Sequence, residues 1–215
     1  MRAGRGRWGR AAVAALGLGM VAAVPMRHTA LRAAGSALVA SDSIAPADVV
    51  VISTGADGAG VLEAADLVQA GVADRVAVFA DPPDPVVDRE FLRRGVPYED
   101  AAARSLRQLA SLGIARIEEI PRPVAGSDDE AHLLPEWCAE RGLRSVVVVT
   151  TADHSRRLRR LLGRTMKGRA TRVTVRPARY SPFDPARWWE TREGIRTQVI
   201  ETEKLALDVL LHPLP

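Results

Sequence analysis

Cysteine is almost absent from this chain of 215 residues, in which Cys138 is the only one. A single cysteine can form no disulfide within the chain and cannot build a cysteine-based zinc site. Aromatic residues are also scarce, at 4%, and the 30 lysine and arginine residues are spread along the chain beside 26 acidic ones. Nucleic-acid binding typically needs a clustered basic surface with aromatic side chains, so we expect no nucleic-acid partner.

Common motifs for cofactor binding and catalysis are also missing. The glycines of "TGADGAG", residues 54–60, have the spacing GxxGxG instead of the dinucleotide-binding GxGxxG. The Walker motif with its lysine and the GxSxG elbow of serine hydrolases are absent. No HxH or DxD pattern and no second histidine accompanies His154, so no metal site is expected. A tight turn is the favoured role for the glycines, and anion binding by backbone N–H groups near Gly55 is the alternative.

The apolar run near the N-terminus is shorter than the roughly 20 residues of a typical membrane-spanning helix. This run, residues 11–24, follows four arginines and ends at Pro25. A basic segment before a short apolar run is typical of a signal peptide or signal anchor, and the charge bias predicts export of the remainder of the chain. We therefore expect residues 1–28 to anchor the protein in the cell membrane and residues 29–46 to be a linker. Residues 47–212 would form one extracytoplasmic α/β domain. There are two alternatives for the N-terminal segment: it is cleaved and the domain is secreted, or it is a buried or disordered leader.

Strand-like and helix-like segments alternate from Asp48 onward, which is typical of a parallel α/β sheet. This pattern predicts a Rossmann-like open, mainly parallel sheet flanked by helices. Strands are expected at residues 48–53, 75–80, 114–120, 145–150 and 172–177. Helices are expected after the glycine turn, at 90–97, at 99–112, from Ser127, at about 155–162, and at the C-terminus to about Leu211. We expect Trp188 and Trp189, in the loop before the last helix, to pack against the sheet, and covering a site or a membrane surface is the alternative.

Ligands of open parallel sheets bind at the carboxyl ends of the strands, where the strand order reverses. This rule brings together four loops, at residues 53–60, 80–85, 122–130 and 150–154. The last loop belongs to "VVVVTTADHSRR", in which a buried strand is followed at once by polar residues. His154 is the best catalytic candidate, because a histidine just past a strand, beside Thr150, Thr151 and Asp153, can act as a general acid or base. Capping of the following helix is its alternative role.

Each charged residue near these loops has two possible roles. Asp153 is expected to be a helix N-cap rather than a metal ligand. Glu130 follows Ser127 by three residues, which is the spacing of a capping box, so Glu130 is either a second catalytic carboxylate or half of that box. Arg156 and Arg157 cannot face one site, because neighbours on a helix point about 100° apart. One of the two arginines would bind an anion and the other would be solvated.

Several segments, in this order, resemble the YdcF-like family, a bacterial domain of unknown function that includes SanA-like and ElyC-like envelope proteins. The resemblance runs from about Ala47 to Leu210 and is most specific at Thr150–Arg157. The family carries there a threonine, a small or hydroxyl residue, then histidine and arginine. The segments that carry the resemblance are "ADVVVISTG", "GVADRVAVFA", "GSDDEA", "VVVVTTADHSRRLRRLL", "WW" and "ETEKLALDVL".

The resemblance implies a Rossmann-like domain behind a membrane segment, with a role in cell-envelope or peptidoglycan-related processes. ElyC-like members are linked to the polyprenyl-phosphate lipid carrier, so an anionic metabolite or a lipid-linked phosphate is the expected ligand. The alternatives are a nucleotide or S-adenosylmethionine binding domain and a non-catalytic interaction module; the cofactor and the reaction stay open. The expected proton-handling residues are His154 and Glu130. The expected ligand-binding residues are Gly55, Ser127, Thr150, Thr151 and Arg157.

Overall fold

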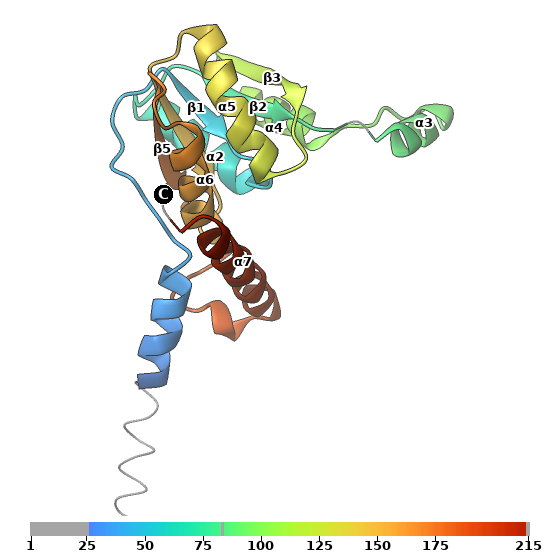
Figure 1. The fold of residues 1–215 in the computed structure, drawn as a ribbon. Coiled ribbons are helices and arrows are strands. Elements are labelled where there is room, and N and C mark those ends of the chain that lie inside the picture. The colour runs from blue at the N-terminus through green and yellow to red at the C-terminus, as the bar shows by residue number, and fades with distance from the viewer. Residues whose placement is uncertain (1–25, 83, 214–215) are drawn as a thin grey trace, which may run out of the picture.

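Five parallel strands form the single sheet of this protein in the computed structural model, which describes residues 26–82 and 84–213 (Figure 1). The strand order is β3-β2-β1-β4-β5. The strands are β1 (Val49–Ile52), β2 (Val76–Ala80), β3 (Ile117–Pro123), β4 (Ser145–Thr150) and β5 (Arg172–Pro177). The prediction of a Rossmann-like parallel sheet flanked by helices is confirmed, although β3 begins three residues later than expected.

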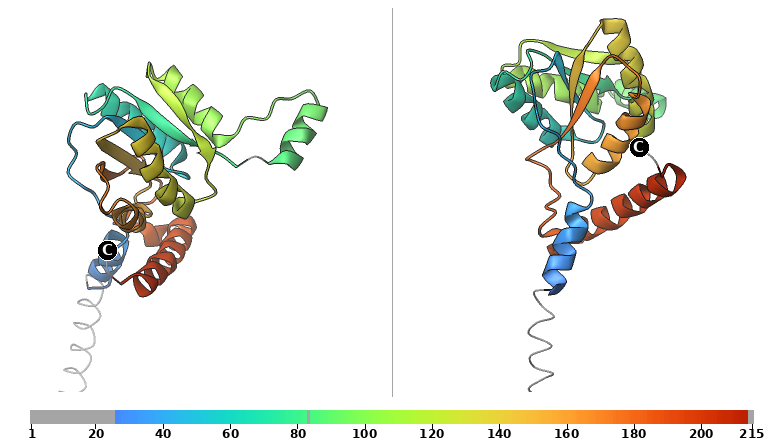
Figure 2. Two further views of the ribbon diagram at one scale, coloured as in Figure 1. Left: turned by 45° about the horizontal axis from the view of Figure 1, so that its top comes forward. Right: turned by 60° about the vertical axis from the view of Figure 1, so that its left-hand side comes forward.

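Helices cover both faces of the sheet (Figure 2). The helices are α2 (Asp57–Gln69), α3 (Pro85–Arg93), α4 (Ala101–Ser111), α5 (Ser127–Arg141), α6 (Ser155–Thr165) and α7 (Arg192–Leu211), and η1 (Trp188–Glu190) is a 3-10 turn. Alternate residues of a strand point to opposite faces. Val50 and Val149 therefore pack with α2 and α4, whereas Val51 and Val148 pack with α5 and α6. Burial on both faces explains why these strands are continuous runs of valine.

The second predicted helix, at residues 90–97, is misplaced. The helix of this region, α3, begins at Pro85 because the carboxylate of Asp84 caps it by accepting hydrogen bonds from the N–H groups of Val86 and Val87. It ends at Arg93, and Figure 1 shows it held away from the sheet.

The predicted capping box at the start of α5 is wrong. Gly126 occupies the N-cap position, and no side chain caps the helix there. Glu130 turns away from the backbone of Ser127 and bonds to the end of β1 instead. Pro135 lies inside α5 and does not delay its start.

The two neighbouring tryptophans pack against the N-terminal helix of the described chain, residues 26–36, and not against the sheet as predicted. Nε1 of Trp188 donates a hydrogen bond to the carbonyl of Leu31 at 2.8 Å, and the ring of Trp189 lies 5.7 Å from that of His28. The apolar run predicted to be an anchor, residues 11–24, lies outside the described residues. Among the residues that are described, no helix has the length and apolar character needed to cross a membrane.

Candidate functional site

The strand order reverses between β1 and β4, which are neighbours in the sheet although β2 and β3 come between them in the chain. Open parallel sheets bind ligands outside the carboxyl ends of the strands at such a switch point. Ser53 and Thr54 follow β1 directly, and Thr150 ends β4. The N–H of Ser53 donates to the carbonyl of Val149 at 2.9 Å. The structure thus brings together two of the loops that the sequence places at the binding edge.

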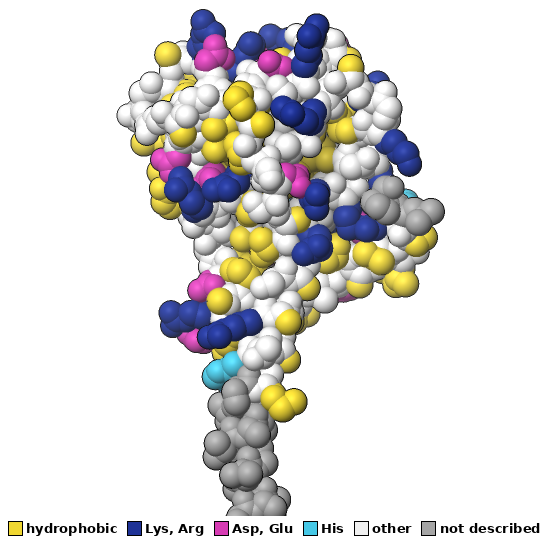
Figure 3. Space-filling model, turned by 90° about the vertical axis from the view of Figure 1, so that its left-hand side faces the viewer, with side chains coloured by type: hydrophobic (Ala, Val, Ile, Leu, Met, Phe, Trp, Pro, Cys, Tyr) yellow, Lys and Arg dark blue, Asp and Glu magenta, His cyan; other side chains and the backbone are white. Residues whose placement is uncertain are grey.

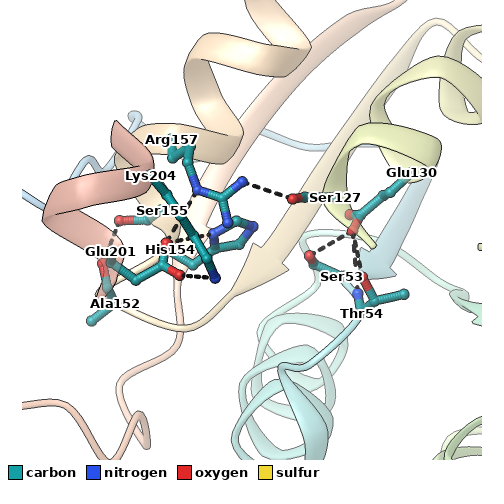
Figure 4. Close-up of polar contacts among 10 residues, drawn as sticks. All are labelled: Ser53, Thr54, Ser127, Glu130, Ala152, His154, Ser155, Arg157, Glu201 and Lys204. Carbon is teal, nitrogen blue, oxygen red and sulfur yellow. Dashed lines mark hydrogen bonds and ion pairs between the residues drawn. The ribbon is translucent and has the colours of Figure 1, made fainter. Parts of the chain in front are cut away.

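Glu130 is completely buried and points from the first turn of α5 toward the end of β1 (Figure 4). Its Oε2 accepts hydrogen bonds from the hydroxyls of Ser53 (2.9 Å) and Thr54 (3.1 Å) and from the N–H of Thr54 (3.3 Å). Burial raises the pKa of Glu130 to about 7, although the bonds from Ser53 and Thr54 and the charge of Arg157 act to lower it. A carboxyl group with this pKa can take up or release a proton near neutrality.

Thr150 faces the same side of the sheet as Glu130. Val146 and Val148 of β4 pack with α5 and α6, so alternation places the Thr150 side chain on that side as well. Its hydroxyl is buried and, like Oε1 of Glu130, has no hydrogen-bond partner among the described residues. An unpaired buried polar atom costs free energy, which indicates that stability alone does not account for a hydroxyl at this position.

Replacing Thr150 with valine should therefore leave the free energy of unfolding unchanged or raise it by up to about 1 kcal/mol, because it removes an unpaired hydroxyl and keeps the side-chain shape. Thr171→Val is the matched control, since the hydroxyl of Thr171 is buried and donates to the carbonyl of Leu143 at 2.7 Å. That variant should lose about 1 kcal/mol. Urea unfolding measures both changes, and a Thr150→Val variant destabilised as much as Thr171→Val would contradict the assignment.

Three nitrogen-bearing side chains converge on one carboxylate, that of Glu201 in α7 (Figure 4). Its Oε2 lies 3.3 Å from Nδ1 of His154 and 3.2 Å from Nε of Arg157, and its Oε1 lies 2.7 Å from Nζ of Lys204. Burial alone would raise the pKa of Glu201, but the hydrogen bonds from His154 and Lys204 and the charge of Arg157 lower it to about 2. An ionised carboxylate only accepts hydrogen bonds, so Nδ1 of His154 carries the proton, and in the neutral ring Nε2 is free to accept one.

Arg157 connects this cluster to α5. Its Nη1 donates to the hydroxyl of Ser127 at 2.9 Å, and Ser127 lies in the same helical turn as Glu130. His154 and Arg157 share a face because they are three residues apart at the start of α6. Arg156 points elsewhere, which confirms that the two arginines do not face one site. Arg156 is not simply solvated, however, because it donates to the carbonyl of Val39 at 2.7 Å.

Two cavities flank these groups. The larger, of about 570 Å³, lies between the start of α5, α6 and α7, and its lining includes Ser127, Arg157 and Lys204 together with Leu207 and Leu211. The other charged side chains around it are Asp128, Asp129, Arg164 and Asp208. The smaller, of about 40 Å³, lies at the ends of β1 and β2 and is lined in part by Ser53, Thr54 and Gly55.

No family model and no curated protein matches this chain. A solved structure with a partial likeness is that of guanylylpyridinol- and ATP-bound HcgE from Methanothermobacter marburgensis. The two are 13% identical with a TM-score of 0.33, over 78% of this chain and 100% of HcgE. A likeness at this level supports no inference about ligand or activity.

Two of the three glycines in the turn after β1 are required by the backbone geometry or by packing, and the third is not. Gly55 has a φ of 77°, which favours glycine, and a Cβ at Gly60 would lie 2.7 Å from Cγ2 of Ile52. A Cβ at Gly58 would meet nothing within 4 Å. Turn geometry and helix–strand packing therefore account for the two constrained glycines, as the tight-turn interpretation expects.

The predicted cap role of Asp153 is wrong, and the sequence did not point to the carboxylate that contacts His154. Asp153 does not cap α6, because His154 itself occupies the N-cap position and no side chain makes a cap bond there. Burial instead raises the pKa of Asp153, while Thr151 beside it forms a hydrogen bond that lowers it. Glu201 was not predicted at all, although it lies in "ETEK", within a segment that carries the family resemblance.

A second buried carboxylate, that of Glu63 in α2, was also not predicted from the sequence. It accepts hydrogen bonds from Nε of Arg176 (2.8 Å) and from Nε and the N–H of Arg179 (both 3.0 Å). Burial opposes its ionisation, but these bonds lower its pKa overall. These contacts hold the end of β5 and the loop that follows it against α2, so we assign Glu63 a structural role. Among the described residues, no group of three or more histidine, cysteine, aspartate or glutamate side chains is placed to hold a metal ion.

Proposed function

We propose that this protein is an envelope-associated member of the YdcF-like family that binds the phosphate of an anionic metabolite or lipid-linked intermediate. The observation that carries this proposal is that Arg157 and Lys204 line the larger cavity, and that Arg157 bonds to Ser127 in the same helical turn as buried Glu130, whose pKa is about 7. Both cationic side chains share the carboxylate of Glu201, and they line the larger cavity together with Arg164 and the acidic Asp128, Asp129 and Asp208.

In this proposal Arg157 and Lys204 bind the anion, and His154 and Glu130 exchange protons. Arg157 offers the planar donor geometry that suits phosphate oxygens, and Lys204 adds a flexible positive charge. His154, oriented by Glu201, accepts a proton at Nε2, as in other sites where a carboxylate holds a catalytic imidazole. Glu130 exchanges its proton through the hydroxyl of Thr54, which also lines the smaller cavity. This arrangement can bind an anion and accept or supply a proton beside it.

The proposed location rests on the N-terminal sequence. The arginines that precede residues 11–24 favour a cytoplasmic amino end, a membrane anchor and an extracytoplasmic domain. A domain anchored at the membrane can reach a phosphate that is attached to a lipid. The proposal therefore includes both an anionic metabolite and a lipid-linked phosphate as ligands.

Ligand binding can be tested on the full-length chain in mild detergent by thermal unfolding with inorganic phosphate, geranylgeranyl monophosphate, ATP and S-adenosylmethionine. A phosphate probe at about 100 times its Kd should stabilise the protein by about 2.7 kcal/mol, or roughly 5–10 °C in Tm. Arg157→Gln should abolish the shift. Arg159→Gln should retain it, because Arg159 lies on the same helix but pairs with Asp42.

The probes separate the competing functions. A shift with geranylgeranyl monophosphate or inorganic phosphate that depends on Arg157 supports the proposal. A shift with S-adenosylmethionine alone would replace it with the methyl-donor alternative, and no shift with any probe would favour a non-catalytic interaction module.

A further inference from the structure

One face of α7 carries apolar side chains that the rest of the described chain leaves exposed. Val199 is 59% exposed and Leu210 is 77% exposed, and Ile195 and Leu207 are exposed beside them. These residues are spaced at intervals that place them along one side of the helix, and the exposed Glu203 lies on the same side between Val199 and Leu207. The opposite side packs inward and buries Gln198 and Glu201. An exposed apolar stripe along a 20-residue helix is typical of a surface that contacts another molecule or a membrane.

The N-terminal part of the chain enters the domain beside α7. Nε2 of Gln198 donates to the carbonyl of Ala34 at 3.1 Å, which ties α7 to the helix of residues 26–36. Figure 2 shows the start of α7 beside this helix, on the side of the molecule remote from β3, and α7 then runs away from the helix toward its own C-terminal end. The sequence before residue 26 contains the apolar run at 11–24. The described chain therefore begins in the helix that contacts α7, and in the sequence the predicted anchor comes directly before that helix.

Basic side chains gather at this end, and Figure 3 shows them together with a few acidic side chains in the lower part of the described molecule. Trp188 and Trp189 lie there, next to the helix of residues 26–36. Tryptophan and arginine favour the headgroup region of a bilayer, and arginine is attracted to anionic lipids. The arginines of this end are Arg27, Arg32, Arg187, Arg192 and Arg196, against the acidic Asp184, Glu190 and Glu193.

We propose that the outer face of α7 lies on the surface of a phospholipid membrane, with its apolar side chains at the boundary between headgroups and acyl chains. This inference rests on the proposed N-terminal anchoring and extends it to a second contact with the bilayer. A membrane suits the face better than a second copy of the chain, because α7 contacts the helix that follows the predicted anchor in the sequence and because arginines gather around that contact. The larger cavity, which is partly lined by Leu207 and Leu211 of α7, would then open beside the membrane surface.

A fluorescence-quenching experiment on the full-length chain tests this contact. Val199→Cys and Leu210→Cys would each be labelled with an environment-sensitive dye and reconstituted into vesicles of phosphatidylethanolamine and phosphatidylglycerol. The native Cys138 is completely buried, and burial raises the pKa of its thiol to about 12, so the added cysteine is the one that reacts. Leu62→Cys is the matched control, because Leu62 is an aliphatic residue of α2 that is 41% exposed.

Lipids that carry a nitroxide near the headgroup should quench both α7 dyes at least about twofold more than the control dye, since an interfacial helix sits about 5–10 Å into the headgroup region. Vesicle flotation reports anchoring separately. A chain that floats but shows equal quenching at all three positions overturns the α7 contact and leaves the anchor intact. Concentration-dependent disulfides between Val199→Cys copies without quenching would assign the face to a dimer, and a chain that does not float would overturn the anchor and the α7 contact together.

Discussion

Replacing Glu201 with alanine is expected to lower the free energy of unfolding by about 3–5 kcal/mol at pH 7, because removal of one partner strands buried charges. The Glu201 and Arg157 side chains are 9% and 13% exposed, so water can do little to replace the lost carboxylate. Glu203→Ala is the matched control, since Glu203 is an exposed carboxylate two residues away on α7. The control should change stability by less than about 0.5 kcal/mol. Urea unfolding followed by circular dichroism measures both variants.

The same residue predicts a loss of stability in acid. The folded-state pKa of Glu201 is about 2, below the ordinary value of 4.5, so the folded protein binds this proton more weakly than the unfolded chain. The resulting stabilisation is fully present above pH 4.5 and is lost as the pH falls through 2. Its size is about 3 kcal/mol, from 1.36 kcal/mol per unit of pKa difference. A wild-type protein and a Glu201→Ala variant with the same acid-side slope would refute the central role of this carboxylate.

Glu130 is expected to have the opposite pH dependence. Its folded-state pKa of about 7 exceeds the ordinary 4.5, so between these values the folded state keeps a proton that the unfolded chain has lost. The stabilisation is complete below pH 4.5 and is lost as the pH rises through 7, which lowers the free energy of unfolding by about 3 kcal/mol. Glu130→Gln removes the titrating group and keeps an oxygen for the N–H of Thr54. This variant should be more stable than the wild type at pH 8.

A matched control separates this effect from general charge changes on α5. Glu136→Gln alters an exposed carboxylate of the same helix, which pairs with Arg122, and should keep the wild-type slope between pH 4.5 and 7. If Glu130→Gln also keeps that slope, Glu130 is not a proton-holding group and the proposed function loses its main support. The windows of Glu201 and Glu130 meet near pH 4.5, so one series of unfolding curves from pH 2 to pH 8 reports on both.

Local sequence patterns predicted the framework because the forces behind them are local. The run Val146–Val149 predicted β4, since a strand covered by helices on both faces needs apolar residues in succession. The adjacency of Arg156 and Arg157 predicted that they do not face one site, because helical periodicity turns neighbours about 100° apart. Their position after β4 predicted that they lie at the binding edge, through the general rule for parallel sheets.

Predictions failed where a side chain has a possible partner nearby in the sequence but bonds to a residue that is distant in the sequence. The spacing of Ser127 and Glu130 fits a capping box, but Glu130 bonds to Ser53, which is 77 residues away in the chain. Trp188 likewise bonds to Leu31, at a separation of 157 residues. Spacing along the chain does not show which of two possible partners a side chain will contact, because the distance between side chains in space depends on how the helices and strands pack.

The sequence by itself therefore determined the parallel α/β architecture, and it proposed a binding edge with His154 and Arg157 as candidates. Only the tertiary structure decided what these residues can do. It placed Glu201 of α7 against His154, 47 residues earlier, and buried Glu130 completely beside Ser53. Ionisation depends on the solvent and charges that surround a group in space. Two glutamates with the same ordinary pKa thus become an ionised anchor for an imidazole and a carboxyl group that titrates near neutrality.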